Sequence, residues 1–108
     1  MELVKYRSRQ LPKRPVIHMP GKWCRTFGIY AGEEVDVIRD RRTILIEKSD
    51  PESTHNKRYV SGTNAINIPL EIINDLGMQP YQLYSLFIDT RNERFIVSLD
   101  NWDEPSRD

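Results

Sequence analysis

The chain contains an internal repeat, and this repeat restricts the folds open to it. When the sequence is shifted by 49 positions, residues 16–20 align with residues 65–69, and Gly28-Ile29 aligns with Gly77-Met78. Two extra residues in the second copy then shift the alignment, and residues 44–46 match residues 95–97. Each copy therefore predicts a short strand, a proline, a helical stretch of eight residues, a glycine and two further strands.

Proline and glycine mark the ends of the two predicted helices. Pro20 and Pro69 stand where a helix begins, because proline is tolerated at the first helical position. Gly28 and Gly77 stand where the helix ends, because glycine readily adopts the left-handed conformation found there. Helical spacing predicts one apolar face in each helix. Its members are Trp23, Cys24 and Phe27 in the first copy and Leu70, Ile73 and Leu76 in the second.

Two β-hairpins complete the copies, since β-rich runs flank turn-forming residues. The predicted strands are residues 34–39 and 43–48 in the first copy and residues 83–89 and 93–99 in the second. The chain thus divides into a first repeat (1–48), a polar linker (49–56), a second repeat (57–99) and an acidic tail (100–108).

Neither repeat is large enough to fold independently. A unit of about 45 residues rarely buries enough apolar surface without a metal, a disulfide or a partner. Cys24 is the only cysteine, so no internal disulfide can form. We therefore expect a mainly β fold in which two β-α-β-β repeats share one core. We also expect strands from both repeats to close a small barrel, because closure removes sheet edges that could aggregate.

Charge is unevenly distributed although the net charge is zero. The first 50 residues hold 11 Lys/Arg against 7 Asp/Glu, whereas residues 51–108 hold 5 against 9. Seven cations lie in the first 25 residues, against Glu2 alone: Lys5, Arg7, Arg9, Lys13, Arg14, Lys22 and Arg25. Strand alternation predicts that Lys5, Arg7 and Arg9 share one face. Such asymmetry favours a polyanion-binding surface, and the alternative is a solvated surface of uneven charge.

Several motifs carry a resemblance to a known family. In the first copy they are Ile17-His18-Met19-Pro20, Arg25-Thr26-Phe27-Gly28-Ile29, Gly32-Glu33-Glu34-Val35-Asp36-Val37 and Thr43-Ile44-Leu45-Ile46. In the second copy they are Lys57-Arg58-Tyr59-Val60, Ile66-Asn67-Ile68-Pro69 and Leu76-Gly77-Met78. In order, spacing and repetition they resemble the AbrB/SpoVT swapped-hairpin domain, over residues 5–48 and 57–99.

The resemblance implies a fold, a function and a set of site residues. Members are mostly bacterial and archaeal transcription regulators, including MazE-type antitoxins, in which two hairpins interleave into one barrel. By position, Arg9 and Arg58 occupy the arginine place of the first strand, and Arg25 occupies one on the helix. The chain departs from the pattern at Pro15 and Asn64, near where an arginine is often found, and at Asn74, where the first copy has Arg25. The expected DNA-binding residues are Lys5, Arg7, Arg9, Lys13, Arg14, Lys22, Arg25 and Arg58.

Other functions remain as alternatives. The acidic second repeat, with Tyr81, Tyr84 and Trp102, could bind a protein partner as antitoxins do, and a small-molecule-binding barrel is a weaker option. An enzyme is not expected, because the sequence contains no glycine-rich phosphate loop, H-E-x-x-H or G-x-S-x-G motif. No cofactor or metal is expected either, since two histidines and one cysteine are too widely spaced.

The remaining expectations concern individual side chains and the cellular setting. Trp23 is expected to be half-buried, Cys24 to be an inert buried thiol rather than a redox sensor, and His18 to face outward. The first hairpin tip, with its three arginines, predicts a salt-bridged surface turn. The lone cysteine and the absence of long apolar runs favour the cytoplasm. The sequence leaves open whether one chain or a homodimer is the working unit.

Overall fold

The computed structural model describes residues 3–99, with the side chains of residues 4–8 outside that description. It contains eight strands and two short helices in this part of the chain. In order they are β1 (Leu3–Gln10), β2 (Val16–His18), α1 (Gly21–Phe27), β3 (Glu34–Asp40), β4 (Thr43–Lys48), β5 (Asn56–Tyr59), β6 (Ala65–Asn67), α2 (Leu70–Leu76), β7 (Leu83–Asp89) and β8 (Arg94–Ser98). Neither helix combines the length and the apolar character that crossing a bilayer would require.

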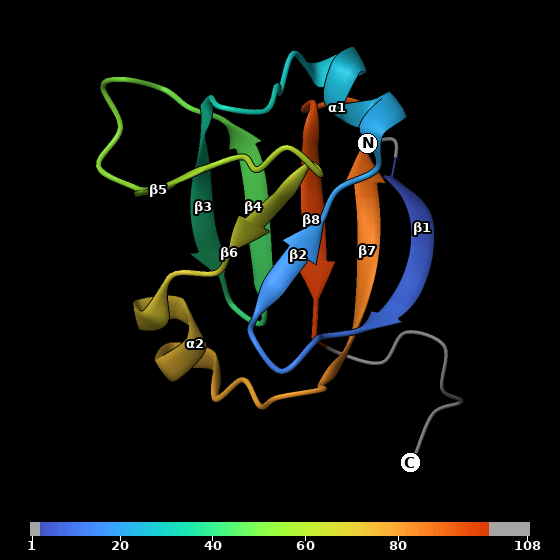
Figure 1. The fold of residues 1–108 in the computed structure, drawn as a ribbon, viewed down its shortest axis with the longest axis vertical. Coiled ribbons are helices and arrows are strands. Elements are labelled where there is room, and N and C mark those ends of the chain that lie inside the picture. The colour runs from blue at the N-terminus through green and yellow to red at the C-terminus, as the bar shows by residue number, and fades with distance from the viewer. Residues whose placement is uncertain (1–2, 100–108) are drawn as a thin grey trace.

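The strands form a six-stranded antiparallel sheet with a two-stranded ribbon packed over one face. The sheet has the order β1-β7-β8-β4-β3-β5, and the ribbon pairs β2 with β6 (Figure 1). Only the hairpins β3–β4 and β7–β8 are local pairings. The other pairs, β1 with β7, β4 with β8, β3 with β5 and β2 with β6, each join the first copy to the second. The prediction that the two copies share one core is therefore confirmed.

The two copies are related by an approximate twofold arrangement that follows the repeat. Arg9 pairs with Tyr84 in one outer pairing, and Arg58 pairs with Val35 in the other. Arg58 lies 49 positions after Arg9, and Tyr84 lies 49 positions after Val35, so the two pairings are equivalent under the repeat. In the ribbon, His18 of the first copy pairs with Ala65 of the second.

The prediction of a closed barrel is wrong. The sheet is open, and within residues 3–99 its edge strands β1 and β5 each pair with one neighbour only. The reason lies in the ribbon, which lies across the sheet and covers its core face (Figure 1). Because this second layer already removes the apolar face from water, burial of the core does not require the sheet to close.

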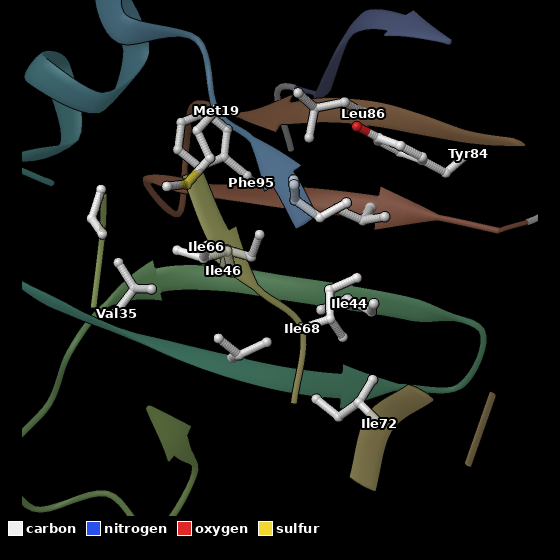
Figure 2. Close-up of a cluster of buried hydrophobic side chains, with 14 of the residues drawn as sticks. Met19, Val35, Ile44, Ile46, Ile66, Ile68, Ile72, Tyr84, Leu86 and Phe95 are labelled. Atoms are coloured by element: carbon white, nitrogen blue, oxygen red, sulfur yellow. The ribbon is translucent and has the colours of Figure 1, made fainter. Parts of the chain in front are cut away.

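The core lies between the sheet and the ribbon and draws on both copies. Ile17 and Ile66 point inward from the ribbon and are at most 1% exposed. Figure 2 shows Ile66 from the ribbon among Ile46 and Phe95 from the sheet. Phe95 is fully buried, and its ring centroid lies 5.4 Å from that of Phe27 in α1. Burial of each such side chain contributes roughly 1.5–3 kcal/mol, and neither copy alone would supply these contacts.

The glycines end the helices as predicted from the sequence. The prolines stand one position earlier than predicted, and the buried face of α2 differs from the predicted face. Gly28 and Gly77 end the helices with φ of 73° and 62°, as predicted. The two prolines are the residues before the first helical residue, with extended ψ, rather than the first helical residues. In α2 the buried positions are Ile72 and Leu76, with Ile73 partly buried, whereas Leu70 is 68% exposed. Leu70 was predicted to be buried, but it opens the helix directly after the cap and lies outside the i, i+4 pair that meets the core.

The linker between the copies is held by a buried carboxylate. Asp36 in β3 is 1% exposed and accepts hydrogen bonds from Lys57 Nζ (2.6 Å), Ser53 Oγ (2.8 Å), Asp50 N (3.2 Å) and Ser49 Oγ (3.3 Å). Burial acts to raise the pKa of Asp36, but the hydrogen bonds from Lys57, Ser53 and Asp50 outweigh it, so that its pKa is lowered. The network fastens the linker, and β5 with it, to the hairpin of the first copy.

Candidate nucleic-acid interface

The outer side of the β2–β6 ribbon is exposed, and the loop and helix on either side of β2 carry Lys13, Arg14, Lys22 and Arg25. We call this outer side, with loops 11–15 and 60–64 and helices α1 and α2 at its ends, the ribbon face. Alternation sends Ile17 and Ile66 into the core and leaves His18 and Asn67 exposed. The prediction that His18 faces outward is confirmed. Because the ribbon is antiparallel, loop 11–15 and loop 60–64 enter it at opposite ends. We call the end at loop 60–64 the Arg9 end, because Arg9 bonds to the carbonyl oxygen of His18 there, and the end at loop 11–15 the Arg58 end, after the residue equivalent to Arg9 in the repeat.

The Arg9 end brings together residues of both copies. Arg9 is half-buried, and its Nη1 donates to the carbonyl oxygen of His18 at 3.4 Å. Arg9 also hydrogen-bonds to Tyr84, whose pKa is raised because its hydroxyl is buried. The Arg25 guanidinium and the Asn64 amide both approach Gly21, where a Cβ atom would lie 3.5 Å and 3.2 Å from them. The helix of the first copy and the loop of the second thus meet at this end.

Lys22 stands one residue after Gly21 at the same end of the ribbon. Its side chain is exposed, and its Nζ lies 5.8 Å from the ring centroid of Trp23. An exposed cation–π contact of this length is weak, about 0.5–1 kcal/mol. It therefore leaves the ammonium group open to an external anion.

The Arg58 end is built from the loop of the first copy and the helix of the second. Ile68 N donates to the carbonyl oxygen of Pro15 at 2.9 Å, which seats loop 11–15 beside the start of α2. In that loop the side chains of Lys13 and Arg14 are exposed. Arg58 is half-buried and donates from Nη1 to the carbonyl oxygen of Lys57 at 2.7 Å.

The exposed cations of the ribbon face differ in their ion pairing from several cations elsewhere in the described residues. Within residues 9–99, where side chains are described, none of Lys13, Arg14, Lys22 and Arg25 forms an ion pair. In contrast, Lys57 pairs with Asp36 at 2.6 Å, Arg94 with Asp89 at 3.1 Å and Arg39 with Asp75 at 3.7 Å. The four charges on the ribbon face are therefore not neutralised by neighbouring carboxylates.

The predicted alignment of Lys5, Arg7 and Arg9 on one face stays a prediction, although the backbone of β1 is irregular there. The register of β1 on β7 shifts between Lys5 and Arg7, so that Lys5 is opposite Phe87 and Arg7 is opposite Leu86. The pairing of the β1 backbone with β7 is therefore irregular between these two residues. The side chains of Lys5 and Arg7 lie outside the described residues. Of the first-strand cations, Arg9 alone has a described side chain.

The structure also decides several secondary expectations. Trp23 is half-buried, with its ring centroid 5.7 Å from that of Phe27, as predicted. Cys24 is 1% exposed, and burial raises the pKa of its thiol to about 11 against the opposing charge of Arg25, so the prediction of a buried thiol is confirmed. At the first hairpin, Arg39 forms an ion pair with Asp75 of α2 at 3.7 Å, so one of its three arginines is paired with a residue outside the turn.

The aromatic surface considered for a protein partner does not form as a unit. Tyr84 is 4% exposed and belongs to the core, whereas Tyr81 is 56% exposed. Trp102 lies outside the described residues. Tyr84 was therefore wrongly placed on that surface, because β7 turns it toward the apolar side of the sheet. Within the described part of the chain no group of three or more His, Cys, Asp or Glu residues could hold a metal ion.

Comparisons with known proteins support the fold alone. No protein-family model matches the sequence, and no curated protein matches it. Among solved structures, the chain is similar to the solution structure of PHS018 from Pyrococcus horikoshii, with a TM-score of 0.50 and 15% sequence identity. The similarity covers 98% of this chain and 100% of that chain. It therefore extends over the whole interleaved arrangement rather than over one repeat.

Sequence reasoning missed the contribution of the second copy's loop. Asn64 was noted only as a departure from an arginine, yet its amide lies beside the start of α1 and its carbonyl accepts from Met19 N at 2.8 Å. The same loop also holds exposed Ser61 and Thr63. The available signal was the expected exchange of strands, which implies that each loop packs on the helix of the other copy.

Proposed function

We propose that this chain is a double-stranded DNA-binding transcription regulator of the AbrB/SpoVT swapped-hairpin kind, which contacts the duplex through its ribbon face. The observation that carries the proposal is the set of four exposed cations at the two ends of one exposed β-ribbon, none of which pairs with a carboxylate of the described residues. Cations held together in this way repel one another, and an external polyanion relieves the repulsion.

The ribbon suits a duplex in shape as well as in charge. A two-stranded β-ribbon fits the major groove of B-DNA, which is about 12 Å wide. Lys13 and Lys22 would contact phosphates, and release of counterions would supply much of the affinity. Arg25 could fork onto a guanine edge, and Asn67 on the ribbon could bind an adenine edge. Phosphate contacts would orient the protein, and the base contacts would select the sequence.

The arrangement of strands supports the same proposal. The resemblance implies that two hairpins interleave, and in this chain the first strand of each copy adds to the hairpin of the other, since β1 pairs with β7 and β5 with β3. Arg9 and Arg58 stand at matching positions in these two pairings. The proposed role is binding in the cytoplasm, without a catalytic step or a cofactor.

A salt titration of DNA binding tests the proposal directly. Fluorescence anisotropy with mixed-sequence duplexes should show binding at low salt and a steep negative slope of log K against log salt. Lys13→Ala and Lys22→Ala should each weaken binding and reduce the slope by about 1 while leaving the melting temperature almost unchanged. Arg91→Ala removes an exposed cation from the β7–β8 turn and serves as the matched control, with little change in the slope. Failure of the wild-type chain to bind any duplex at low salt would disprove the proposal.

A further inference from the structure

The two ends of the ribbon face are related by the repeat but differ chemically. One pair of equivalent cationic positions is retained, Arg9 and Arg58. At five further pairs of equivalent positions on the ribbon face, the first copy has a charged or ionisable residue and the second copy has a residue of another type. These pairs are Lys13 and Gly62, Arg14 and Thr63, His18 and Asn67, Lys22 and Glu71, and Arg25 and Asn74.

Packing between the copies decides which of these groups share an end. Loop 60–64 packs on the region of α1, since Met19 N donates to Asn64 O and Gly32 N donates to Val60 O, both at 2.8 Å. Loop 11–15 packs on the region of α2 through the bond from Ile68 N to Pro15 O. Loop 11–15 precedes β2 and α1 follows it, so these two cationic elements of the first copy lie at opposite ends of the ribbon. The exchange decides which element of the second copy lies beside each of them.

Each end therefore carries charge on a different element. At the Arg9 end the cations are on the helix, as Lys22 and Arg25, and the neighbouring loop 60–64 is uncharged. At the Arg58 end the cations are on the loop, as Lys13 and Arg14, and α2 carries Glu71 and Asp75. Both ends attract phosphates, but the cationic donors lie on a helix at the Arg9 end and on a loop at the Arg58 end.

A symmetric protein matches a palindromic site because both half-sites meet the same groups. In this chain, the position of Arg25 at one end, suited to guanine, corresponds to Asn74 at the other, an amide suited to adenine. An acidic side chain such as Glu71 also repels phosphate where its counterpart Lys22 attracts it. Unlike ends should therefore prefer unlike half-sites.

We propose that the ribbon face recognises a non-palindromic DNA duplex and binds it in one fixed orientation. This inference rests on the proposed DNA-binding function and specifies the class of duplex. It assigns the specificity to α1 at the Arg9 end and to loop 11–15 at the Arg58 end. The two cationic elements come from the first copy and are separated by β2, and the exchange of strands places a different element of the second copy beside each.

Selection from random duplexes provides the test. The shortest selected site that keeps full affinity is compared with two palindromes, each made by repeating one of its halves. The selected site should bind at least tenfold more tightly than either palindrome, since a wrong base at one bidentate contact costs roughly 5- to 150-fold in affinity. Arg25→Ala should relax base preference in one half only, and Lys13→Ala should weaken contacts to the other half.

Orientation is read from a cleavage reagent placed at one end. Gly62→Cys adds a thiol in loop 60–64, where no atom lies within 4 Å of a new Cβ. Cys24 is buried, so an iron chelate will label the introduced cysteine in the native protein. Hydroxyl radicals should then cut the selected duplex in one half only. The double variant Glu71→Lys/Asn74→Arg gives α2 the charges of α1. It should bring the affinity for the palindrome built from the half bound at the Arg9 end closer to the affinity for the selected site.

The outcomes separate the inference from the function on which it rests. Failure to bind any duplex removes the proposed function. Binding with a palindromic selected site, with no converged sequence, or with equal cleavage in both halves overturns the inference and leaves DNA binding in place.

Discussion

Substitution of Lys57 by methionine should reveal how much the buried network contributes to stability. Lys57→Met keeps the length of the side chain and removes the ammonium group, which lies 2.6 Å from a carboxylate oxygen of Asp36. Asp36 is 1% exposed, so water cannot replace the lost partner without opening the structure. Removal of one partner from a buried ion pair costs about 3–5 kcal/mol.

The environment of the pair reduces this figure. The Lys57 side chain is 24% exposed, and Asp36 keeps its bonds from Ser53 Oγ, Asp50 N and Ser49 Oγ. Since these remaining donors still solvate the carboxylate, we expect a loss of about 2–3 kcal/mol in the free energy of unfolding. Lys13→Met is the matched control, because Lys13 is exposed and forms no ion pair within the described residues; its effect should stay within about 0.5 kcal/mol.

Urea unfolding followed by circular dichroism measures the difference. The double variant Asp36→Asn/Lys57→Met should recover part of the loss, because the buried charge is removed with its partner. If Lys57→Met is no less stable than Lys13→Met, the buried carboxylate does not depend on the ammonium group and the reasoning fails.

The same network predicts the pH dependence. The pKa of Asp36 is lowered in the folded protein, so its contribution is fully present above the ordinary aspartate range and is lost as the pH falls through the lowered pKa. Asp36→Asn should therefore flatten the acid side of the stability curve. A residual slope should remain from Asp89, whose pKa is lowered by its bonds with Asn92 and Arg94 in spite of burial. An unchanged acid limb in Asp36→Asn would contradict this assignment.

Three further predictions concern the core and the helix ends. Cys24 should resist a thiol reagent in the native protein and react after denaturation, because burial raises the pKa of its thiol to about 11; rapid native labelling would contradict this. Gly28→Ala should destabilise the protein by roughly 1 kcal/mol in thermal unfolding, since Gly28 has φ of 73°, whereas Gly62→Ala at an open position should not. Phe95→Ala should cost about 3–5 kcal/mol in urea unfolding, and a loss below 1 kcal/mol would show that the residue does not fill the shared core.

Local structure was predictable wherever the backbone itself restricts the chain. Gly28 and Gly77 end the helices as expected, because few other residues adopt a positive φ at low cost. Strands β4 and β7 begin and end at the predicted residues 43–48 and 83–89. The buried face of α2 was less predictable, because a helix of seven residues has too few apolar positions to fix one face by periodicity.

Features that depend on strand pairing were beyond the reach of local patterns. The bulge between Lys5 and Arg7 follows from the fit of β1 on β7 of the other copy, and nothing near those residues in the sequence indicates it. The open sheet likewise reflects how the ribbon covers the core, which is a property of the assembled layers. The network around Asp36 needed the linker to fold back over β3.

By itself the sequence determined that two copies of one small unit must combine, because neither can bury enough apolar surface alone. It also determined that the first copy carries the excess of positive charge. Only the tertiary structure decided where that charge lies, since pairing between the copies seats the loop of each on the helix of the other. Lys22 and Arg25 are thereby placed beside loop 60–64 of the second copy, and Lys13 and Arg14 beside α2. The physical reason is that residue type fixes the charge, whereas the long-range hydrogen bonds of the sheet fix its position.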